Sequence, residues 1–116
     1  MTLNLDAKRL RRVFYNLMHN AADAMADKGA LTLSFKQTDR ELITELADTG
    51  PGIAPEILPR LFQPFATHGK AHGSGLGLAI CKKIVEDHGG SITARNNPAG
   101  GAVFSFSLPL AAAPKS

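Results

Sequence analysis

The sequence predicts a two-layer α/β (α+β) sandwich, in which a mixed β-sheet packs against about three helices. Apolar residues recur at helical spacing in two stretches, and two pairs of short segments alternate between apolar and polar residues as strands do. The chain has 116 residues, the size of one domain, and contains no internal repeat. Strand pairs and helices in so short a chain are accommodated by one sheet with its helices on one face.

Composition describes an ordinary globular domain, with 44% hydrophobic, 20% charged and 6% aromatic residues. A single cysteine, Cys81, excludes an internal disulfide framework and a four-cysteine zinc site. No apolar run approaches the roughly 18 residues of a membrane-spanning helix, and the charged start differs from a signal peptide. We therefore expect a cytoplasmic domain, and its net charge of +3 does not demand a nucleic-acid partner.

The first element is expected to be a short strand at residues 2–5, followed by a long helix. Asp6 stands where a helix N-cap belongs, the amphipathic pattern runs to about Lys28, and Gly29 is a helix-ending glycine. The core face of this helix is predicted to comprise Leu10, Val13, Phe14, Leu17, Ala21, Ala24 and Met25.

A hairpin follows, with strands at residues 30–37 and 41–47 joined by Thr38-Asp39-Arg40. The segment DTGPGI at residues 48–53 contains two glycines and a proline, which exclude regular structure. Pro55 is placed as the first residue of a short helix over residues 55–62.

Residues 63–75 have no apolar period and are expected to form a loop. A second amphipathic helix begins at Ser74 or Gly75 and runs to about His88. Strands at residues 91–96 and 102–108 then form a second hairpin.

The first helix carries a second, polar stripe. Asn16, Asn20 and Asp23 are spaced i, i+4 and i+7, so they share one side of the helix. Such side chains can supply oxygen ligands to Mg²⁺, although a solvated polar face has the same pattern.

Two glycine-rich segments are candidates for ligand contacts. In DTGPGI a carboxylate at a strand end precedes glycines that allow close backbone approach, which suits a planar ligand with hydrogen-bond donors; a plain turn is the alternative. The segment GSGLGL at residues 73–78 leads into a helix, where free N–H groups favour phosphate. It matches neither the Walker A loop nor the dinucleotide-binding fingerprint.

Taken in order, the asparagine stripe, DTGPGI, Phe62-Gln63-Pro64-Phe65 and GSGLGL resemble the ATP-binding catalytic domain of sensor histidine kinases. That domain belongs to the Bergerat-fold superfamily, which includes DNA gyrase, the Hsp90 chaperones and MutL. The resemblance implies a catalytic domain at residues 1–110, a mobile ATP lid at about 63–75 and a flexible tail at 111–116. The acidic residue Asp23, three positions after Asn20, makes the chain resemble the nitrogen-regulation-type subgroup of these kinases.

The resemblance also implies roles for single residues. Asn20 would be the Mg²⁺ ligand, Asn16 would lie near the phosphates, and Asp48 would accept a hydrogen bond from the exocyclic amine of adenine. The nucleotide-binding residues it implies are Asn16, Asn20, Asp48, Gly50, Gly52, Ile53, Phe65, Gly73, Ser74, Gly75, Leu76, Gly77, Leu78 and Ser105.

Two positions depart from related families. Many histidine kinases carry Lys or Arg where this chain has Asp23. Positive charge for the γ-phosphate must then come from Lys70 or from Arg60. Lys70 and Asn16 are the two candidate catalytic residues. Gyrase and MutL resemble one another in having a glutamate base at the position of Asn16. An asparagine cannot take the proton from water, which favours transfer to a protein acceptor over hydrolysis.

The expected acceptor is a histidine outside this chain. None of His19, His68, His72 and His88 is followed by an acidic residue, as the phosphorylated histidine of the family is. The resemblance implies transfer from Mg-ATP to a helical dimerisation and histidine phosphotransfer domain, in cis or in trans, with a response regulator downstream.

Further expectations concern partners and alternatives. The isolated domain should be monomeric, without nucleic-acid or membrane contact, and could be the cytoplasmic part of a membrane-bound sensor. Residues Lys8, Arg9, Arg11 and Arg12 form either a solvated helix face or a docking surface for the phosphoacceptor hairpin. The alternative functions are a non-catalytic nucleotide-binding regulatory module and, with less support, a gyrase/MutL-type ATPase.

Overall fold

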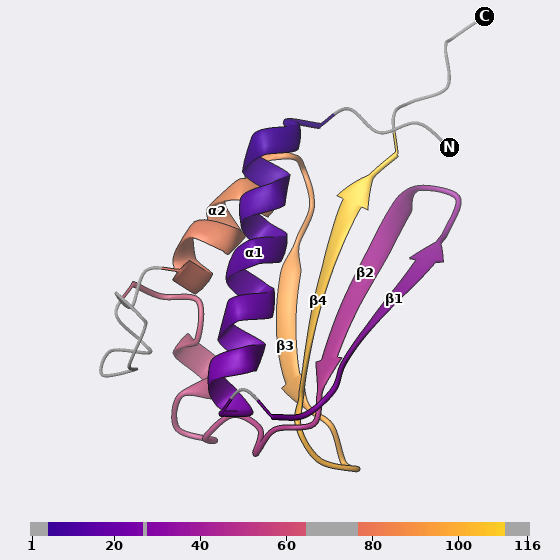
Figure 1. Cartoon of the computed structure of the whole chain (residues 1–116). Coiled ribbons are helices and arrows are strands. Elements are labelled where there is room, and N and C mark those ends of the chain that lie inside the picture. The colour runs from indigo at the N-terminus through magenta and orange to yellow at the C-terminus, as the bar shows by residue number, and fades with distance from the viewer. Residues whose placement is uncertain (1–4, 27, 65–76, 111–116) are drawn as a thin grey trace, which may run out of the picture.

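The two-layer α/β sandwich is confirmed in a computed structural model that describes residues 5–26, 28–64 and 77–110. The elements in chain order are α1 (Ala7–Ala24), β1 (Leu31–Gln37), β2 (Glu41–Asp48), the 3-10 helix η1 (Leu58–Arg60), α2 (Gly77–Asp87), β3 (Ile92–Asn96) and β4 (Ala102–Pro109). Both α-helices lie on one face of the sheet (Figure 1). In this part of the chain no helix combines the length and apolar character needed to cross a membrane.

The sheet has the strand order β1-β2-β4-β3, and every pair in this described sheet is antiparallel. The expectation of a mixed sheet is therefore corrected for the described residues. Strands β2 and β3 do run in the same direction, but β4 lies between them, so the hairpins join through the antiparallel pair β2–β4. The predicted strand at 2–5 falls mostly outside the described residues, and Leu5 is not in a strand.

Helix α1 begins as predicted and ends earlier than predicted. The Asp6 carboxylate accepts a hydrogen bond from the backbone N–H of Arg9 at 3.2 Å, as an N-cap does. The helix ends at Ala24 because Ala26 adopts a left-handed conformation, with φ of 51°, and its N–H turns back to the carbonyl of Asp23. The predicted extension to Lys28 was wrong.

The short helix expected at 55–62 was also wrong: only one 3-10 turn, η1, forms there. Its hydrogen bonds join residues three apart, as from the Arg60 N–H to the Ile57 carbonyl. Pro59 lies inside this turn, where it lacks an N–H and its ring opposes a continuing α-helix.

The core lies between the sheet and the two helices. Phe106 is 1% exposed and meets Phe14 of α1 edge to face, with ring centroids 5.4 Å apart. Phe62, two residues after η1, meets Phe104 in the same way, with ring centroids 6.2 Å apart. The buried core residues of the two helices are Leu10, Val13, Leu17, Ala21, Leu78, Cys81, Ile84 and Val85.

Polar contacts hold the start of α1 against the end of α2. The Arg9 guanidinium forms an ion pair with the Asp87 carboxylate, and Lys83 lies 3.6 Å from the same group. The backbone N–H of Asp6 donates to Nε2 of His88 at 2.9 Å. These contacts fix the relative position of the two helices, and the opposite end of α1 carries Asn20 and Ala24, which line the pocket described next.

Candidate functional site

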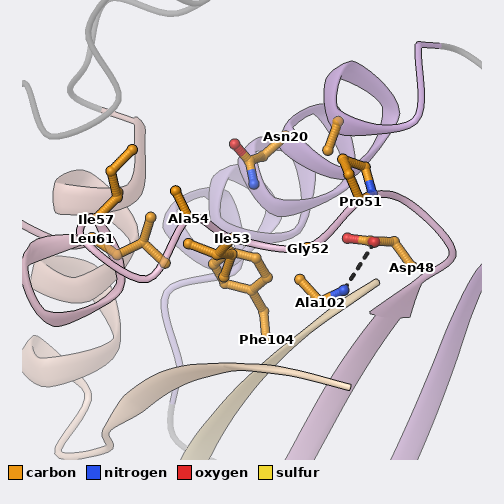
Figure 2. Close-up of a pocket in the computed structure, with 11 residues that line it drawn as sticks. Asn20, Asp48, Pro51, Gly52, Ile53, Ala54, Ile57, Leu61, Ala102 and Phe104 are labelled. Carbon is orange, nitrogen blue, oxygen red and sulfur yellow. Dashed lines mark hydrogen bonds between the residues drawn. The ribbon is translucent and has the colours of Figure 1, made fainter. Parts of the chain in front are cut away.

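A pocket of about 250 Å³ opens at the end of the sheet where β2 stops and β4 starts. Figure 2 shows Asp48 at one end of it and Ile57 with Leu61 at the other, with Asn20 projecting from α1. The lining residues are Asn20, Ala24, Asp48, Pro51, Gly52, Ile53, Ala54, Ile57, Leu61, Ala102 and Phe104. Most of this lining is apolar, so the few polar groups in it determine how a ligand would be oriented.

Asp48 is the buried carboxylate of this pocket, only 5% exposed. Its Oδ1 accepts hydrogen bonds from the backbone N–H of Gly50 at 2.9 Å and of Ala102 at 3.1 Å. Both bonds use the same oxygen, which leaves Oδ2 without a partner among the described residues and turned toward the pocket (Figure 2). The plain turn given above as the alternative is therefore present, in the form of an Asx turn, together with an acceptor available to a ligand.

Gly101 allows β4 to start directly against Asp48. Its φ is +86°, and a Cβ at this position would overlap the carbonyl group of Asp48. A side chain would therefore push away the strand that brings the Ala102 N–H to the Asp48 carboxylate.

The loop between Asp48 and η1 forms the second wall of the pocket. Gly50 packs closely, since a Cβ there would lie 3.2 Å from Asp48 Oδ1 and 3.3 Å from the Ala24 carbonyl oxygen. Further along, the side chain of Asn96 makes two hydrogen bonds to the backbone of Ile53. The predicted residues Asp48, Gly52 and Ile53 are thus gathered around one pocket.

The asparagine stripe faces this pocket and the start of α2. Asn20 lines the pocket, and the Asn16 side-chain amide donates to the carbonyl of Gly77 at 3.3 Å. Gly77 is the first described residue of α2, so Asn16 joins α1 to the end of α2 where N–H groups have no partner within the helix. No group of three or more His, Cys, Asp or Glu side chains suitable for a metal occurs in the described residues.

Cys81 lies one turn further along α2, fully buried against α1. Burial raises the pKa of its thiol to about 11, with opposing contributions from Asn16 and Arg12. The thiol therefore stays protonated at neutral pH, and Cys81 serves as a small residue of the core.

Several predicted site residues are not brought to the pocket. Ser105 lies on β4 between the core residues Phe104 and Phe106, so its side chain points to the opposite face of the sheet. Leu78 has its side chain in the core, and Arg60 is exposed on η1 outside the pocket lining. The predicted site residues outside the described part of the chain are Phe65, Lys70, Gly73, Ser74, Gly75 and Leu76.

Several residues that line or support the pocket were missed as site residues. Ala102 and Phe104 could have been found, because the alternation that puts Phe106 in the core puts them on the same face. Gly101 and Asn96 gave no such signal, since their partners lie more than 40 residues away in sequence.

Comparison with known families matches residues 5–112 to the family described as histidine kinase-, DNA gyrase B- and HSP90-like ATPase. Among curated proteins, the chain is similar to the sensor histidine kinase ZraS of Salmonella typhi, with 43% identity over 112 residues. The match covers 95% of this chain and 24% of that kinase, so the chain spans about a quarter of the relative's length.

The chain is also similar to solved structures. The mycobacterial sensor histidine kinase MprB superposes with a TM-score of 0.83 at 32% identity, over 93% of this chain and 76% of that one. Full-length ShkA in complex with AMPPNP superposes with a TM-score of 0.74 at 34% identity, over 92% of this chain and 23% of that one.

Proposed function

The chain belongs to the family of histidine kinase-, DNA gyrase B- and HSP90-like ATPases, and we propose that it binds Mg-ATP for a histidine kinase. The observation that carries this proposal is the buried Asp48 carboxylate, with one oxygen held by two backbone N–H groups and the other turned into an apolar pocket. An apolar slot with one charged acceptor at its end suits a flat base that carries an amine.

Recognition of the base would depend on Asp48 Oδ2. The exocyclic amine of adenine can donate to this oxygen, while Ile53 and Phe104 provide apolar contact for the ring. Guanine has a carbonyl in place of that amine, so it would set an acceptor against an acceptor. The geometry therefore supports selection of adenine over guanine.

The triphosphate would extend toward α1 and the start of α2. The N-terminal N–H groups of α2 and the positive end of its dipole favour phosphate, and Asn16 lies beside Gly77 at this end. Roles for Lys70 and for the glycine-rich residues before Gly77 stay predictions from the sequence.

The Mg²⁺ ion would be held chiefly through Asn20 and the nucleotide. Mg²⁺ keeps several waters and takes few protein ligands when it is bound with phosphates. The described residues fit this mode, because Asn20 projects into the pocket and no larger cluster of acidic, histidine or cysteine ligands is present among them. When bound, the ion would neutralise phosphate charge.

Phosphoryl transfer to a protein is favoured over hydrolysis. The Asn16 side chain cannot take a proton, and its amide is engaged with Gly77. Asp48 is the only carboxylate among the described residues that line the pocket, and it lies at the end opposite Ile57, held by backbone N–H groups. The described geometry therefore does not favour a gyrase/MutL-type ATPase, and the labelling experiment below separates the kinase from the regulatory module.

The acceptor and the response regulator would belong to other parts of the kinase system. Both ring nitrogens of His88 are engaged, by the Asp6 N–H and the Ile84 carbonyl, and His19 is followed by Asn20 and not by an acidic residue. We propose a separate helical phosphotransfer domain, a cytoplasmic location, a monomeric isolated domain and no contact of this domain with nucleic acid or membrane. The nitrogen-regulation subgroup, and the boundaries at 1–110, 63–75 and 111–116, stay predictions.

One labelling experiment tests this function. The chain is incubated with γ-labelled ATP and Mg²⁺, with and without a histidine-bearing helical hairpin from a sensor kinase. Label on the hairpin is the expected result. Release of free phosphate without the hairpin would indicate an ATPase, and nucleotide binding without either product would indicate a regulatory module.

A further inference from the structure

The pocket wall formed by residues 49–54 has no regular secondary structure, so something outside it must hold its shape. At its start the Gly50 N–H bonds to Asp48, and at its end the Ala54 carbonyl accepts from Ile57 and Leu58. Between these points the wall contributes Pro51, Gly52 and Ile53 to the pocket. This middle part is where a ligand would meet the backbone.

Asn96, the last residue of β3, holds this middle part from outside the pocket. Its Oδ1 accepts from the Ile53 N–H at 2.6 Å, and its Nδ2 donates to the Ile53 carbonyl at 2.9 Å. One amide side chain thus satisfies both backbone groups of a single residue, as a paired residue of a neighbouring strand would. Asn96 itself is not among the residues that line the pocket.

Gly52 and Asn96 are fitted to each other. Gly52 has φ of +87°, and a Cβ there would lie 2.8 Å from Asn96 Oδ1. Only a glycine both adopts this backbone conformation readily and leaves room for the amide. The close approach of the wall to β3 therefore depends on both residues.

Asn96 is also linked to the carboxylate at the end of the pocket. In the sheet Asn96 pairs with Ala102, whose N–H bonds to Asp48 Oδ1. Contacts between the ends of β3, β4 and β2 thus fix the position of the wall relative to the Asp48 carboxylate.

We propose that Asn96 is a positioning residue for nucleotide binding, which keeps the wall at Gly52 and Ile53 in the shape that receives the base. This inference rests on the proposed function. If the wall leaves this shape most of the time in the absence of Asn96, the apparent affinity falls by the fraction of molecules that stay competent.

The test compares Asn96→Ala with wild type and with Asn97→Ala in the full chain. Asn97 is the matched control, because among the described residues its Oδ1 bonds only to the Ala99 N–H within the next turn. Dissociation constants for an ATP analogue with Mg²⁺ are measured where melting curves show every variant folded. We expect about tenfold weaker binding for Asn96→Ala, which is about 1.4 kcal/mol and the scale of one or two net hydrogen bonds, and no change for Asn97→Ala.

Hydrogen exchange at the Ile53 amide provides a second readout. We expect this amide to be protected in wild type and in Asn97→Ala, and to exchange rapidly in Asn96→Ala. If Asn96→Ala does not fold, Asn96→Asp takes its place, because it retains an acceptor for the Ile53 N–H and loses the donor to the carbonyl.

The outcomes separate the two proposals. Wild-type binding with an unchanged dissociation constant in the folded Asn96 variant overturns the positioning role and leaves the proposed function intact. An unprotected Ile53 amide in wild type also overturns it. Absence of nucleotide binding by wild type would overturn the proposed function, and the positioning role for nucleotide with it, even where exchange shows that Asn96 holds Ile53.

Discussion

Asp48 Oδ1 accepts a hydrogen bond from the backbone N–H of Ala102, 54 residues further along the chain, at 3.1 Å. This bond joins the end of β2 to the start of β4 and leaves the other carboxylate oxygen turned toward the pocket (Figure 2). Oδ1 therefore has a structural role, while Oδ2 is available to a ligand. Substitutions can distinguish the contributions of the two oxygens.

Asp48→Asn is expected to weaken ATP binding by roughly 1.5–3 kcal/mol, the range for a charge-assisted hydrogen bond. The asparagine oxygen can still accept from Gly50 and Ala102, which turns its NH₂ group toward the amine of adenine, donor against donor. The same change should narrow the preference for ATP over GTP. Calorimetric titration with both nucleotides measures the effect.

Glu45→Gln is the control for that substitution. It removes one negative charge from the same strand, where Glu45 lies 3.5 Å from Arg95. Its affinity for ATP should equal that of wild type. Unchanged ATP affinity in Asp48→Asn would rule out the adenine assignment.

Asn20→Ala is expected to abolish the Mg²⁺-dependent part of ATP binding, because the pocket loses the side-chain oxygen proposed as the metal ligand. Affinities measured with Mg²⁺ and with EDTA give this difference for each variant. His19→Ala, at an adjacent and exposed position, should keep the full Mg²⁺ effect. A full Mg²⁺ effect in Asn20→Ala would argue against the ligand role.

Gly101→Ala is expected to lower the free energy of unfolding more than Gly100→Ala. Both glycines have positive φ, at +86° and +111°, so both substitutions share the cost of a left-handed alanine, about 1–2 kcal/mol. Only a Cβ at 101 meets other atoms within 4 Å, among them the Asp48 carbonyl, which adds about 1–3 kcal/mol of overpacking. Urea unfolding of both variants measures the difference, and equal losses would show that β4 can shift away freely.

Acid should remove the contribution of Asp87 to stability. The hydrogen bond from Arg9, with the charges of Lys83 and Arg9, holds the pKa of the Asp87 carboxyl below its ordinary value of 3.8. Because the folded state binds this proton more weakly than the unfolded state, the stabilisation is complete above pH 3.8 and is lost as pH falls through the lowered pKa.

Asp87→Asn should therefore be less stable than wild type at pH 7, and the gap should close in acid below the ordinary carboxyl pKa. Urea unfolding at pH 7, pH 4 and lower measures it, with Asp39→Asn in the β1–β2 turn as the control. A gap that stays constant with pH would show that the ion pair does not account for it.

Local pattern predicted most of the secondary structure. The four strands β1 to β4 agree with their predicted ranges to within a residue at each end, because alternation along a strand and the glycines around it are local signals. The two wrong predictions, the end of α1 and the helix at 55–62, have local causes that leave a weaker signal in the sequence. Ala26 takes a left-handed conformation without being glycine, and Pro59 limits η1 to a 3-10 turn.

Site residues that belong to one motif or one helix face were predicted from the sequence. Contacts between two distant segments, such as Asn96 with Ile53, were missed. Asp48, Gly52 and Ile53 belong to one motif, and Asn20 lies on a helix face that spacing alone defines. Ser105 was placed at the site although alternation within its own strand points it to the other face.

The sequence by itself determined the family and the two-layer sandwich, and it predicted the motif residues that we propose to meet ATP, because periodicity and motif order are properties of contiguous chain. Only the tertiary structure decided that every pair in the described sheet is antiparallel, that Ala102 fixes Asp48, and that Asn96 holds Ile53. These contacts join strand ends and loops 43 to 54 residues apart. Hydrogen bonds at such separations depend on how the sheet brings its strand ends together, which no local pattern encodes.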